Sequence, residues 1–398
     1  MKTRVIVAGG GASGLAAGIW AAREGAAVTI LERNDRPGRK LSATGSGRCN
    51  FSNLEIGEDS FRGTDPGFAA PALKDFGPED AADFFRDIGL LWVCNGPYLY
   101  PRNMQAASVA MMLADEFAAC GGKLKTNERI RRIVPGETGF TVCTDTWHYE
   151  ADAVILALGS SASAIAGSGT DGYELAESLG HHIVTPLPAL TALKCAGFRF
   201  GGWAGVRTQG AVTLLVDGER VKRAAGELQL TGYGISGIPV FDISRYAVRA
   251  LWEKKSVQVS LDFLPELDRG AAAELFSLAR KRYPNRPLKS LLAGWFPDKL
   301  AEVLASLEDP VNGVRDFRLT VTDSLSSEHA QALSGGVDTS EIDPASMQSR
   351  LVKGLYFCGE LVDIDGNCGG YNLQWAWSSG RCAGRNAAYI SRHGREQM

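Results

Sequence analysis

The sequence predicts an α/β protein whose Rossmann-like domain is formed by both ends of the chain and is interrupted by an inserted domain. A β-branched run at residues 4–8 opens directly onto a glycine-rich turn, as a buried parallel strand does before a nucleotide-binding loop. A short apolar strand at residues 354–358 leads into a glycine and an acid near the C-terminus. Between these ends, short apolar runs alternate with glycine-rich turns over residues 191–264, which is typical of antiparallel β structure.

The turn after the first strand matches the dinucleotide-binding pattern G-x-G-x-x-G. Gly9 suits the tight turn, Gly11 the close approach of a pyrophosphate, and Gly14 the close packing of a helix on the strand. The helix predicted over residues 15–24 would then present free N–H groups and the positive end of its dipole to the phosphates. These residues therefore predict a dinucleotide site.

Glu32 closes the second predicted strand, at residues 28–31. A carboxylate at this distance from the glycines can accept hydrogen bonds from a ribose diol, so FAD or NAD is expected here rather than NADP. A second literal match, at residues 167–172, neither follows a strand directly nor precedes an acid-tipped strand. We interpret it as the loop before a helix at residues 173–179.

Three further segments favour FAD over NAD. The basic, glycine-interrupted loop at residues 33–53 can wrap a pyrophosphate from its far side. The apolar strand at residues 153–158 ends in small residues and glycine, as strands that pass close to a flavin cofactor do. Near the C-terminus, the glycine pair 369–370 precedes a helix predicted at residues 373–388, whose positive end would stabilise the negative charge of a reduced flavin.

Composition excludes several classes of protein. The 398 residues carry a net charge of −3 without long runs of like charge, so neither nucleic acid nor a membrane is expected as a partner. The 8 cysteines include no CxxC pair, and the histidines form no ligand cluster, with His181 and His182 expected as a surface pair. No metal site is therefore predicted. Glycines 9–11 interrupt the only stretch similar to a secretory signal, and no run approaches the ~20 apolar residues of a spanning helix, so we expect a cytoplasmic protein.

Five groups of segments, in order from Val5 to Gly384, are characteristic of one group of flavoproteins. They are GGGASGLAAG, PGRKLSATGSGRCNFSN, GSGTDGYELAESLGH with PLPALTAL, TGYGISG, and GLYFCGELVDIDGNCGGYNLQWAWSSGRCAG. On these segments the chain resembles the BaiN/YhiN-like flavoproteins, NAD(P)/FAD-dependent oxidoreductases also described as aminoacetone-oxidase-family FAD-binding enzymes. The resemblance covers nearly the whole chain, and GRCN and GGYNLQWAWSSG are its most specific parts.

The resemblance implies a Rossmann-like FAD-binding domain interrupted by an inserted β-barrel with a small helical piece. We place the FAD-binding domain at residues 1–187 and 330–398, and the inserted domain at residues 188–329 with a helical segment at about 266–310. A strand predicted at residues 320–323 would return toward the first domain.

Two segments depart from the family pattern. ALGSS, at residues 157–161, stands where members commonly carry a threonine and paired glycines. In SGIPVFDIS, Ile238 occupies a position where members usually have proline. The first departure leaves the detailed contacts near the flavin open.

The resemblance also implies contacts with FAD at the matched positions. They fall in the phosphate loop, in the acid and basic loop after the second strand, at the end of the central strand, and in the C-terminal element. The positions are Gly9, Gly11, Ala12, Ser13, Gly14, Glu32, Arg33, Arg39, Lys40, Arg48, Asn50, Gly159, Gly359, Glu360, Asp363, Gly370, Tyr371 and Asn372.

The catalytic residues are not identified by the sequence. Cys49 in the GRCN loop could lie near the isoalloxazine or simply pack in the core. Tyr233 in TGYGISG could donate a proton, form a stacking wall or pack, and Tyr100 is a further candidate of the same kind.

The fold and the resemblance together predict a FAD-dependent oxidoreductase. We expect NADH or NADPH as a transient reductant and an activated C=C bond, or a similar small organic substrate, bound between the FAD-binding and inserted domains. One alternative is a flavin-dependent RNA-modifying enzyme, which the acidic charge and the lack of basic clusters disfavour. Another is a flavin-binding protein or oxidase that does not use NAD(P)H. The physiological substrate and the oligomeric state are not determined by the sequence.

Overall fold

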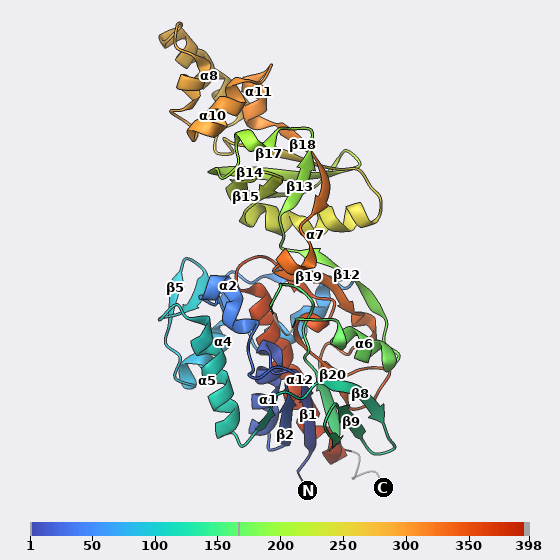
Figure 1. Cartoon of the computed structure of the whole chain (residues 1–398). Helices are drawn as coiled ribbons and strands as arrows, with labels where there is room; N and C mark the ends of the chain where they lie inside the picture. The colour runs from blue at the N-terminus through green and yellow to red at the C-terminus, as the bar shows by residue number, and fades with distance from the viewer. Residues whose placement is uncertain (1, 166–167, 394–398) are drawn as a thin grey trace. The chain divides into compact units, whose positions relative to one another are not determined.

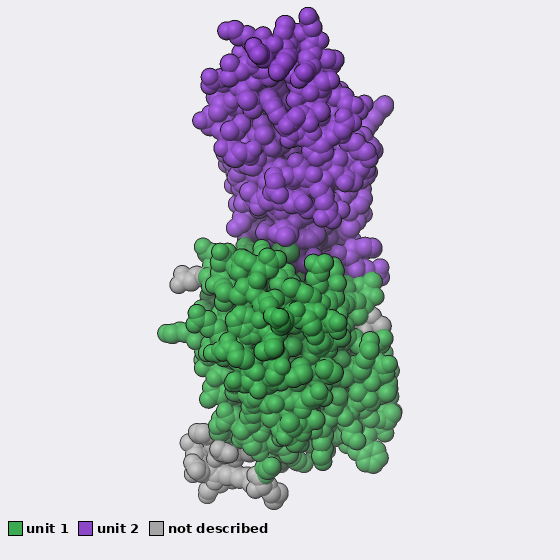
Figure 2. Space-filling view, turned by 90° about the vertical axis from the view of Figure 1, so that its left-hand side faces the viewer, with its two compact units in different colours: residues 1–186, 332–398 green, residues 187–331 purple. Residues whose placement is uncertain are grey.

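The chain forms two compact units, residues 1–186 with 332–398 and residues 187–331, which Figure 2 colours separately. This computed structural model describes residues 2–165 and 168–393, so Gly167 of the second glycine motif lies outside the described residues. Each unit has its own cluster of buried apolar side chains. Among the described residues, no helix combines the length and apolarity that crossing a bilayer requires.

The first unit is built on a five-stranded parallel sheet in the order β20-β11-β1-β2-β7 (Figure 1). β1 (Arg4–Ala8) lies at its centre, between β2 (Ala27–Leu31) and β11 (Ala153–Leu156). The edges are β7 (Lys123–Lys125) and β20 (Leu355–Phe357). Because β20 comes from the far end of the chain and pairs in parallel with β11, the C-terminal segment completes the sheet that the N-terminus begins. The predicted Rossmann-type fold is confirmed.

Two helices from opposite ends of the chain, α1 (Ala12–Arg23) and α12 (Tyr371–His393), pack along one another. The contact runs through two glycines of α12. A β-carbon at Gly380 or Gly384 would lie 2.6 or 2.2 Å from a carbonyl oxygen of α1, closer than any real β-carbon contact. Glycine at these positions therefore lets the two helix backbones approach each other.

Smaller elements complete the first unit. Three antiparallel strands, β8 to β10, form one sheet, β3-β6-β5 form another, and the remaining helices pack around the core. Their bounds are β3 (Ser52–Asn53), β4 (Phe61–Arg62), α3 (Ala70–Asp75), α4 (Pro78–Asp87), β5 (Trp92–Asn95), β6 (Tyr98–Pro101), α5 (Ala106–Ala119), β8 (Ile130–Pro135), β9 (Phe140–Thr144), β10 (His148–Ala151), α6 (Asp171–Ser178) and β21 (Asp365–Gly366).

The second unit contains a closed barrel of six strands in the order β13-β16-β15-β14-β17-β18, with β13 pairing β18 to close it. Helices follow the barrel strand β17 in the chain, as predicted for this segment. The bounds are β13 (Leu193–Ala196), β14 (Arg207–Val216), β15 (Glu219–Leu230), β16 (Gly234–Ser236), β17 (Val257–Asp262), α8 (Arg269–Arg282), α9 (Leu288–Leu292), α10 (Asp298–Ala305), α11 (Pro310–Arg315) and β18 (Phe317–Ser324). The predicted barrel with a helical segment is confirmed.

Two predictions for this unit need correction. The stretch interpreted as continuous β structure contains a 15-residue helix, α7 (Ile238–Trp252). Its β-branched and aromatic residues favour strands, but Val240, Ile243 and Ala247 are fully buried at helical spacing, and packing outweighs propensity. The strand expected to return toward the first domain is β18, which pairs with β13 and β17 inside the barrel.

The connection between the units is made by two paired strands, β12 (Ile183–Ala189) and β19 (Ala332–Val337). Hydrogen bonds join Asp338 N to the His182 carbonyl and Gln331 N to the Leu190 carbonyl, 3.0 and 3.3 Å long. The outgoing and returning chain segments are therefore held side by side.

Candidate cofactor site

The glycine-rich loop between β1 and α1 has a different steric reason for each of its three motif glycines. Gly9 has a φ of +100°, and a β-carbon there would lie 2.7 Å from the Ala157 carbonyl oxygen. A β-carbon at Gly14 would lie 1.9 Å from the Gly9 oxygen, so this glycine closes the helix onto the strand. At Gly11, by contrast, a β-carbon would meet nothing within 4 Å. The space beside Gly11 is therefore open to a ligand, as a pyrophosphate site requires.

Glu32 is 7% exposed and bonds to the same loop. One carboxylate oxygen accepts a hydrogen bond of 2.8 Å from Gly10 N, and the other accepts from the backbone and side-chain nitrogens of Asn34 at 2.8 and 2.7 Å. Each oxygen can accept more than one hydrogen bond, so the carboxylate remains able to bind a ribose hydroxyl. The acid thus also fixes the loop before the cofactor binds.

A second helix N-terminus belongs to the same unit. α12 begins at Tyr371, and Gln374 N donates to the Gly370 carbonyl at 3.0 Å. A β-carbon at Gly370 would lie 2.5 Å from the Ser52 oxygen and 2.9 Å from Asn50 Oδ1. That Asn50 oxygen is buried and has no hydrogen-bond partner among the described residues. A buried acceptor without a donor, next to a helix N-terminus, fits a polar ligand atom.

The polar and aromatic side chains of the QWAWSS segment are anchors that sequence reasoning missed. Trp377 Nε1 donates to the Phe51 carbonyl at 2.8 Å, which fixes the chain next to Asn50. Gln374 accepts from Ser52 Oγ at 2.6 Å, and Ser379 Oγ accepts from Gly359 N at 3.0 Å. α12 therefore ties the GRCN loop and the Gly359 segment together.

Three of the four basic residues predicted to contact FAD form ion pairs, each with a different acidic residue. Lys40 pairs with Glu360 at 2.6 Å, and both were predicted cofactor residues. Arg33 pairs with Asp171 at 3.1 Å, and Arg39 lies 3.8 Å from Asp35. The remaining predicted cation, Arg48, is exposed.

Asp171 is held as a carboxylate by two arginines. Burial alone would raise its pKa, but hydrogen bonds and charges from Arg129 and Arg33 outweigh burial and keep the pKa below its usual range. The Arg33 side chain is therefore positioned by a charged partner at the start of α6.

Other predicted cofactor residues make structural contacts. The Asp363 carboxylate accepts hydrogen bonds from the backbone and side chain of Thr64 at 2.9 and 2.6 Å. The Asn372 side chain bonds to both the N–H and the carbonyl of Gly366, which leaves its backbone as the part available to a ligand. Gly359 has a φ of +70°, and a β-carbon there would lie 2.4 Å from Ser13 Oγ.

The other predicted positions lie in the same unit. Ala12 begins α1, and Tyr371 is buried with its ring against Phe61. Gly159 follows β11 with a φ of +69°, and a β-carbon there would meet nothing within 4 Å.

Tyr173 is a candidate that the sequence did not single out. It lies on α6 and is 6% exposed, and its hydroxyl has no hydrogen-bond partner among the described residues. Burial raises its pKa, and the charges of Glu360 and Asp363 raise it further, so the hydroxyl is protonated and can donate. No signal in the sequence distinguishes this tyrosine from an ordinary core residue.

The three candidate catalytic residues have different environments. Cys49 is fully buried with a φ of +58°, and burial raises the pKa of its thiol to about 12, which favours packing over thiolate chemistry. Tyr100 is half-buried; burial raises its pKa and the charge of Arg48 opposes the rise. Tyr233 belongs to the second unit and is 40% exposed.

The expectation that His181 and His182 form a surface pair is wrong for His181. Its side chain is buried, with the two ring nitrogens 3.1 Å from Glu341 Oε2 and 2.9 Å from Ser349 Oγ. The ring also packs edge-on against Phe357. Of this pair, only His182 is exposed. Within the part of the chain that the structure describes, no group of His, Cys, Asp and Glu is arranged to hold a metal ion.

The residues of the first unit fit FAD. Two glycine-preceded helix N-termini can face anionic groups, and the open space at Gly11 admits a pyrophosphate. The Glu32 carboxylate can accept a hydrogen bond from a ribose hydroxyl, and the unpaired polar atoms of Asn50 and Tyr173 offer a ligand one acceptor and one donor.

Comparisons with known proteins agree with this fit. A family model described as the HI0933-like protein Rossmann domain matches residues 3–386. The chain is 40% identical to the 3-dehydro-bile acid delta(4,6)-reductase of Clostridium scindens, over 97% of its own length and 99% of the relative's. It is 29% identical to the ribosomal RNA dihydrouridine synthase of Escherichia coli, over 94% of its own length and 95% of the relative's.

Among solved structures, a 3-ketosteroid delta1-dehydrogenase from Sterolibacterium denitrificans matches with a TM-score of 0.54 and 12% identity. The match covers 96% of this chain and 99% of the other. At this identity the likeness concerns the fold.

Proposed function

Since the chain belongs to the HI0933-like Rossmann family and is a FAD-dependent oxidoreductase, we propose that it reduces an activated C=C bond of a small organic substrate with electrons from NADH or NADPH. The observation that carries the proposal is the 40% identity, over nearly the full length of both chains, to a reductase of dehydro-bile acids. The substrate class that this relative suggests is a steroid-like enone or dienone.

In this proposal the protein binds and orients while the cofactor supplies the redox chemistry. FAD, when bound, provides the two-electron transfer. The loop at Gly9–Gly14 and the N-terminus of α1 would hold its pyrophosphate, and Glu32 would hold a ribose. The N-terminus of α12 would stabilise negative charge on the reduced ring.

A second candidate function is the reduction of a uridine in RNA. Relatives at 29% and 28% identity over 94% of this chain are ribosomal RNA dihydrouridine synthases, and dihydrouridine is likewise the product of reducing a conjugated C=C bond. The net charge of −3 and the lower identity favour the small-molecule substrate.

The first test is the visible spectrum of the purified protein before and after anaerobic addition of NADH or NADPH. We expect flavin bands that bleach with one of the two nucleotides, which would identify the reductant. Bands that persist with both nucleotides would contradict NAD(P)H use. A colourless protein that FAD cannot reconstitute would contradict the cofactor site.

Turnover distinguishes the two candidate substrates. The reduced enzyme is mixed anaerobically with a 3-oxo-4,6-diene steroid or with unmodified ribosomal RNA, and flavin reoxidation is followed with product analysis by mass spectrometry. Reoxidation by the steroid, with a mass gain of two hydrogens in the steroid, supports the proposal. Dihydrouridine formation without steroid reduction would establish the second candidate instead.

A further inference from the structure

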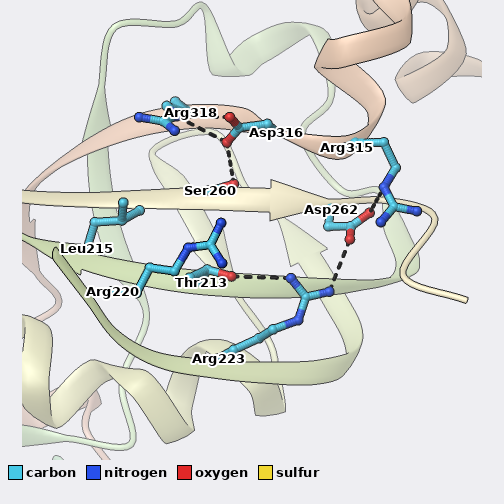
Figure 3. Close-up of a pocket in the computed structure, with 9 residues that line it drawn as sticks. All are labelled: Thr213, Leu215, Arg220, Arg223, Ser260, Asp262, Arg315, Asp316 and Arg318. Carbon is cyan, nitrogen blue, oxygen red and sulfur yellow. Dashed lines mark hydrogen bonds and ion pairs between the residues drawn. The ribbon is translucent and has the colours of Figure 1, made fainter. Parts of the chain in front are cut away.

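The outer surface of the barrel contains a cavity of about 160 Å³ that is separate from the residues assigned to FAD (Figure 3). It is lined by Arg220, Arg223, Arg315 and Arg318, together with Asp262 and Asp316. Four arginines in one small cavity are unusual in a chain whose net charge is −3. Neither the dinucleotide motif nor the C-terminal element accounts for them.

The strand register explains how the cavity forms. Arg223 on β15 lies opposite Thr213 on β14, Thr213 lies opposite Ser260 on β17, and Ser260 lies opposite Arg318 on β18. On β14, Val212 and Leu214 point into the barrel core, so the alternation of side chains turns Thr213 outward. Four neighbouring strands therefore present one row of polar side chains on the outer face.

The carboxylates do not neutralise the arginines. Asp262 is only 4% exposed in its side chain and pairs with Arg223 at 3.0 Å and with Arg315 at 3.1 Å. Asp316 pairs with Arg318 at 3.1 Å and accepts from Ser260 Oγ at 2.6 Å. Two carboxylates against four guanidinium groups leave two positive charges in excess.

The cavity also retains unused hydrogen-bond donors. The guanidinium group of Arg315 already has protein partners, because it donates to the carbonyls of Leu264 and Leu267 and pairs with Asp262. The Arg220 side chain has no ion-pair or hydrogen-bond partner among the described residues, and in Figure 3 no dashed line reaches it. Thr213 Oγ1 accepts from Arg223 at 3.3 Å, so its hydroxyl hydrogen is available to an acceptor.

We propose that this cavity is a binding site for the phosphate group of a small phosphorylated ligand. Guanidinium groups with unused N–H donors bind phosphate oxygens through strong, charge-assisted hydrogen bonds. Donors from Arg220, Arg223, Arg318 and Thr213 converge from three strands, which suits the several oxygens of a phosphate better than the two of a carboxylate. The small volume and the two flanking aspartates fit a single phosphate rather than a nucleic-acid backbone.

The test measures phosphate binding by the FAD-loaded full-length protein at constant ionic strength, because added salt screens such contacts. Isothermal titration calorimetry uses inorganic phosphate, adenosine 2′,5′-bisphosphate and a single-stranded oligouridylate as separate probes. FAD saturation fills the dinucleotide site, and the charge variants distinguish binding at the barrel from binding of the bisphosphate at a site for NADPH. The variant is Arg220→Gln, and the matched control is Arg282→Gln, which removes the same charge from an exposed position at the end of α8.

We expect inorganic phosphate and the bisphosphate to bind, and Arg220→Gln to weaken both about tenfold, the loss expected for one charge-assisted contact. Arg282→Gln should leave both affinities unchanged. Equal weakening by the two variants, or no binding of either inorganic phosphate or the bisphosphate, would overturn the proposal. Binding of the oligouridylate alone would overturn it in favour of an RNA-binding surface.

The site and the proposed reductase activity are tested separately. In one outcome the protein binds no FAD, while Arg220→Gln still weakens phosphate binding and Arg282→Gln does not. That result would support the phosphate site and contradict the proposed function. Circular dichroism of Arg220→Gln provides the folding control, and we expect no change, because the side chain is exposed and has no partner in the described structure.

Discussion

At the scale of single residues, the three motif glycines of the first loop show that one pattern combines different physical requirements. Gly9 and Gly14 are required by the protein's own backbone, which a β-carbon would approach to 2.7 and 1.9 Å. Gly11 is not required by the fold, since a β-carbon there would meet no atom within 4 Å. A requirement for glycine at Gly11 must therefore come from the ligand.

Gly11→Ala separates folding from cofactor binding. The variant should fold normally, because the φ of −77° at Gly11 suits alanine, but its methyl group would exclude the pyrophosphate. We expect the affinity for FAD to fall about 100-fold, the loss of roughly two charge-assisted hydrogen bonds. Quenching of flavin fluorescence measures it. Gly57→Ala, at another open glycine of this unit, is the control, and an unchanged affinity in Gly11→Ala would contradict the assignment.

Tyr173→Phe tests whether the unpaired hydroxyl serves the cofactor. Removing a buried hydroxyl without a partner should raise the free energy of unfolding of the FAD-free protein by about 1 kcal/mol. If the hydroxyl donates to FAD, the affinity for FAD should fall about fivefold in the same variant. Urea unfolding and FAD titration measure the two effects.

Tyr356→Phe is the matched control, since that buried hydroxyl donates to the Asn386 carbonyl at 3.3 Å. It should lower stability and leave FAD affinity unchanged. A Tyr173→Phe variant with unchanged FAD affinity would show that its hydroxyl is not a cofactor contact.

At the scale of elements, α12 both presents a helix N-terminus and holds distant segments of the first unit together. Its side chains bond to Phe51, Ser52 and Gly359, three positions distant in the sequence. Its glycines press its backbone onto α1. The two helix N-termini assigned to FAD are therefore held by one helix pair, which couples the stability of the packing to the geometry of the site.

Gly384→Ala tests this coupling. A β-carbon 2.2 Å from the Ala17 oxygen must push α12 away from α1, and overpacking of this kind costs about 1–3 kcal/mol. We expect a lower midpoint of thermal unfolding and weaker FAD binding. Gly201→Ala, at an open position in the second unit, should change neither quantity, and a stable Gly384→Ala variant would contradict the close helix contact.

His181 makes the stability of the first unit depend on pH. Burial lowers its pKa, although Glu341 opposes the effect, so below an ordinary value near 6.5 the unfolded chain binds protons that the folded chain resists. The contribution of the neutral imidazole is fully present above pH 6.5 and is lost as the pH falls below it. Urea unfolding at pH 7.5 and 5.5 should show a larger loss of stability in the wild type than in His181→Gln. Equal losses would contradict this assignment.

At the scale of the whole molecule, the two units have separate apolar cores, and every residue predicted to contact FAD belongs to the first. The inserted unit begins and ends at paired strands, β12 and β19. The second unit begins at residue 187 and ends at residue 331. These two positions are close enough to be joined by a short turn, because Gln331 N donates a hydrogen bond to the nearby Leu190 carbonyl.

Replacing residues 188–330 by a short glycine-containing hairpin turn should therefore preserve FAD binding. We expect a yellow, folded protein with flavin absorption bands like those of the full chain, because no predicted cofactor contact is removed. Visible spectroscopy and gel filtration test this. A folded deletion variant that cannot bind FAD would show that the inserted unit contributes to the cofactor site.

The sequence by itself determined the features that depend on neighbours along the chain. The strand–glycine–helix order at Gly9–Gly14, the acid at Glu32, the C-terminal strand and helix, and the alternation of the barrel strands are all local patterns. They sufficed for the Rossmann-type sheet and for antiparallel β structure in the inserted segment, whereas the closed barrel was implied by the family resemblance. The helix α7 was missed because its β-branched residues resemble strands until their burial at helical spacing is known.

Only the tertiary structure decided which distant residues meet. The burial of His181 against Glu341 and the anchoring of the GRCN loop by Trp377 join residues 160 and 326 positions apart. The unpaired hydroxyl of Tyr173 is visible only once its surroundings are known. The arginines of the barrel cavity come from β15, β18 and the end of α11, and they form one site because the pairing of β15, β14, β17 and β18 brings them together. No local signal encodes such contacts, because burial and pairing are properties of the folded chain rather than of any segment.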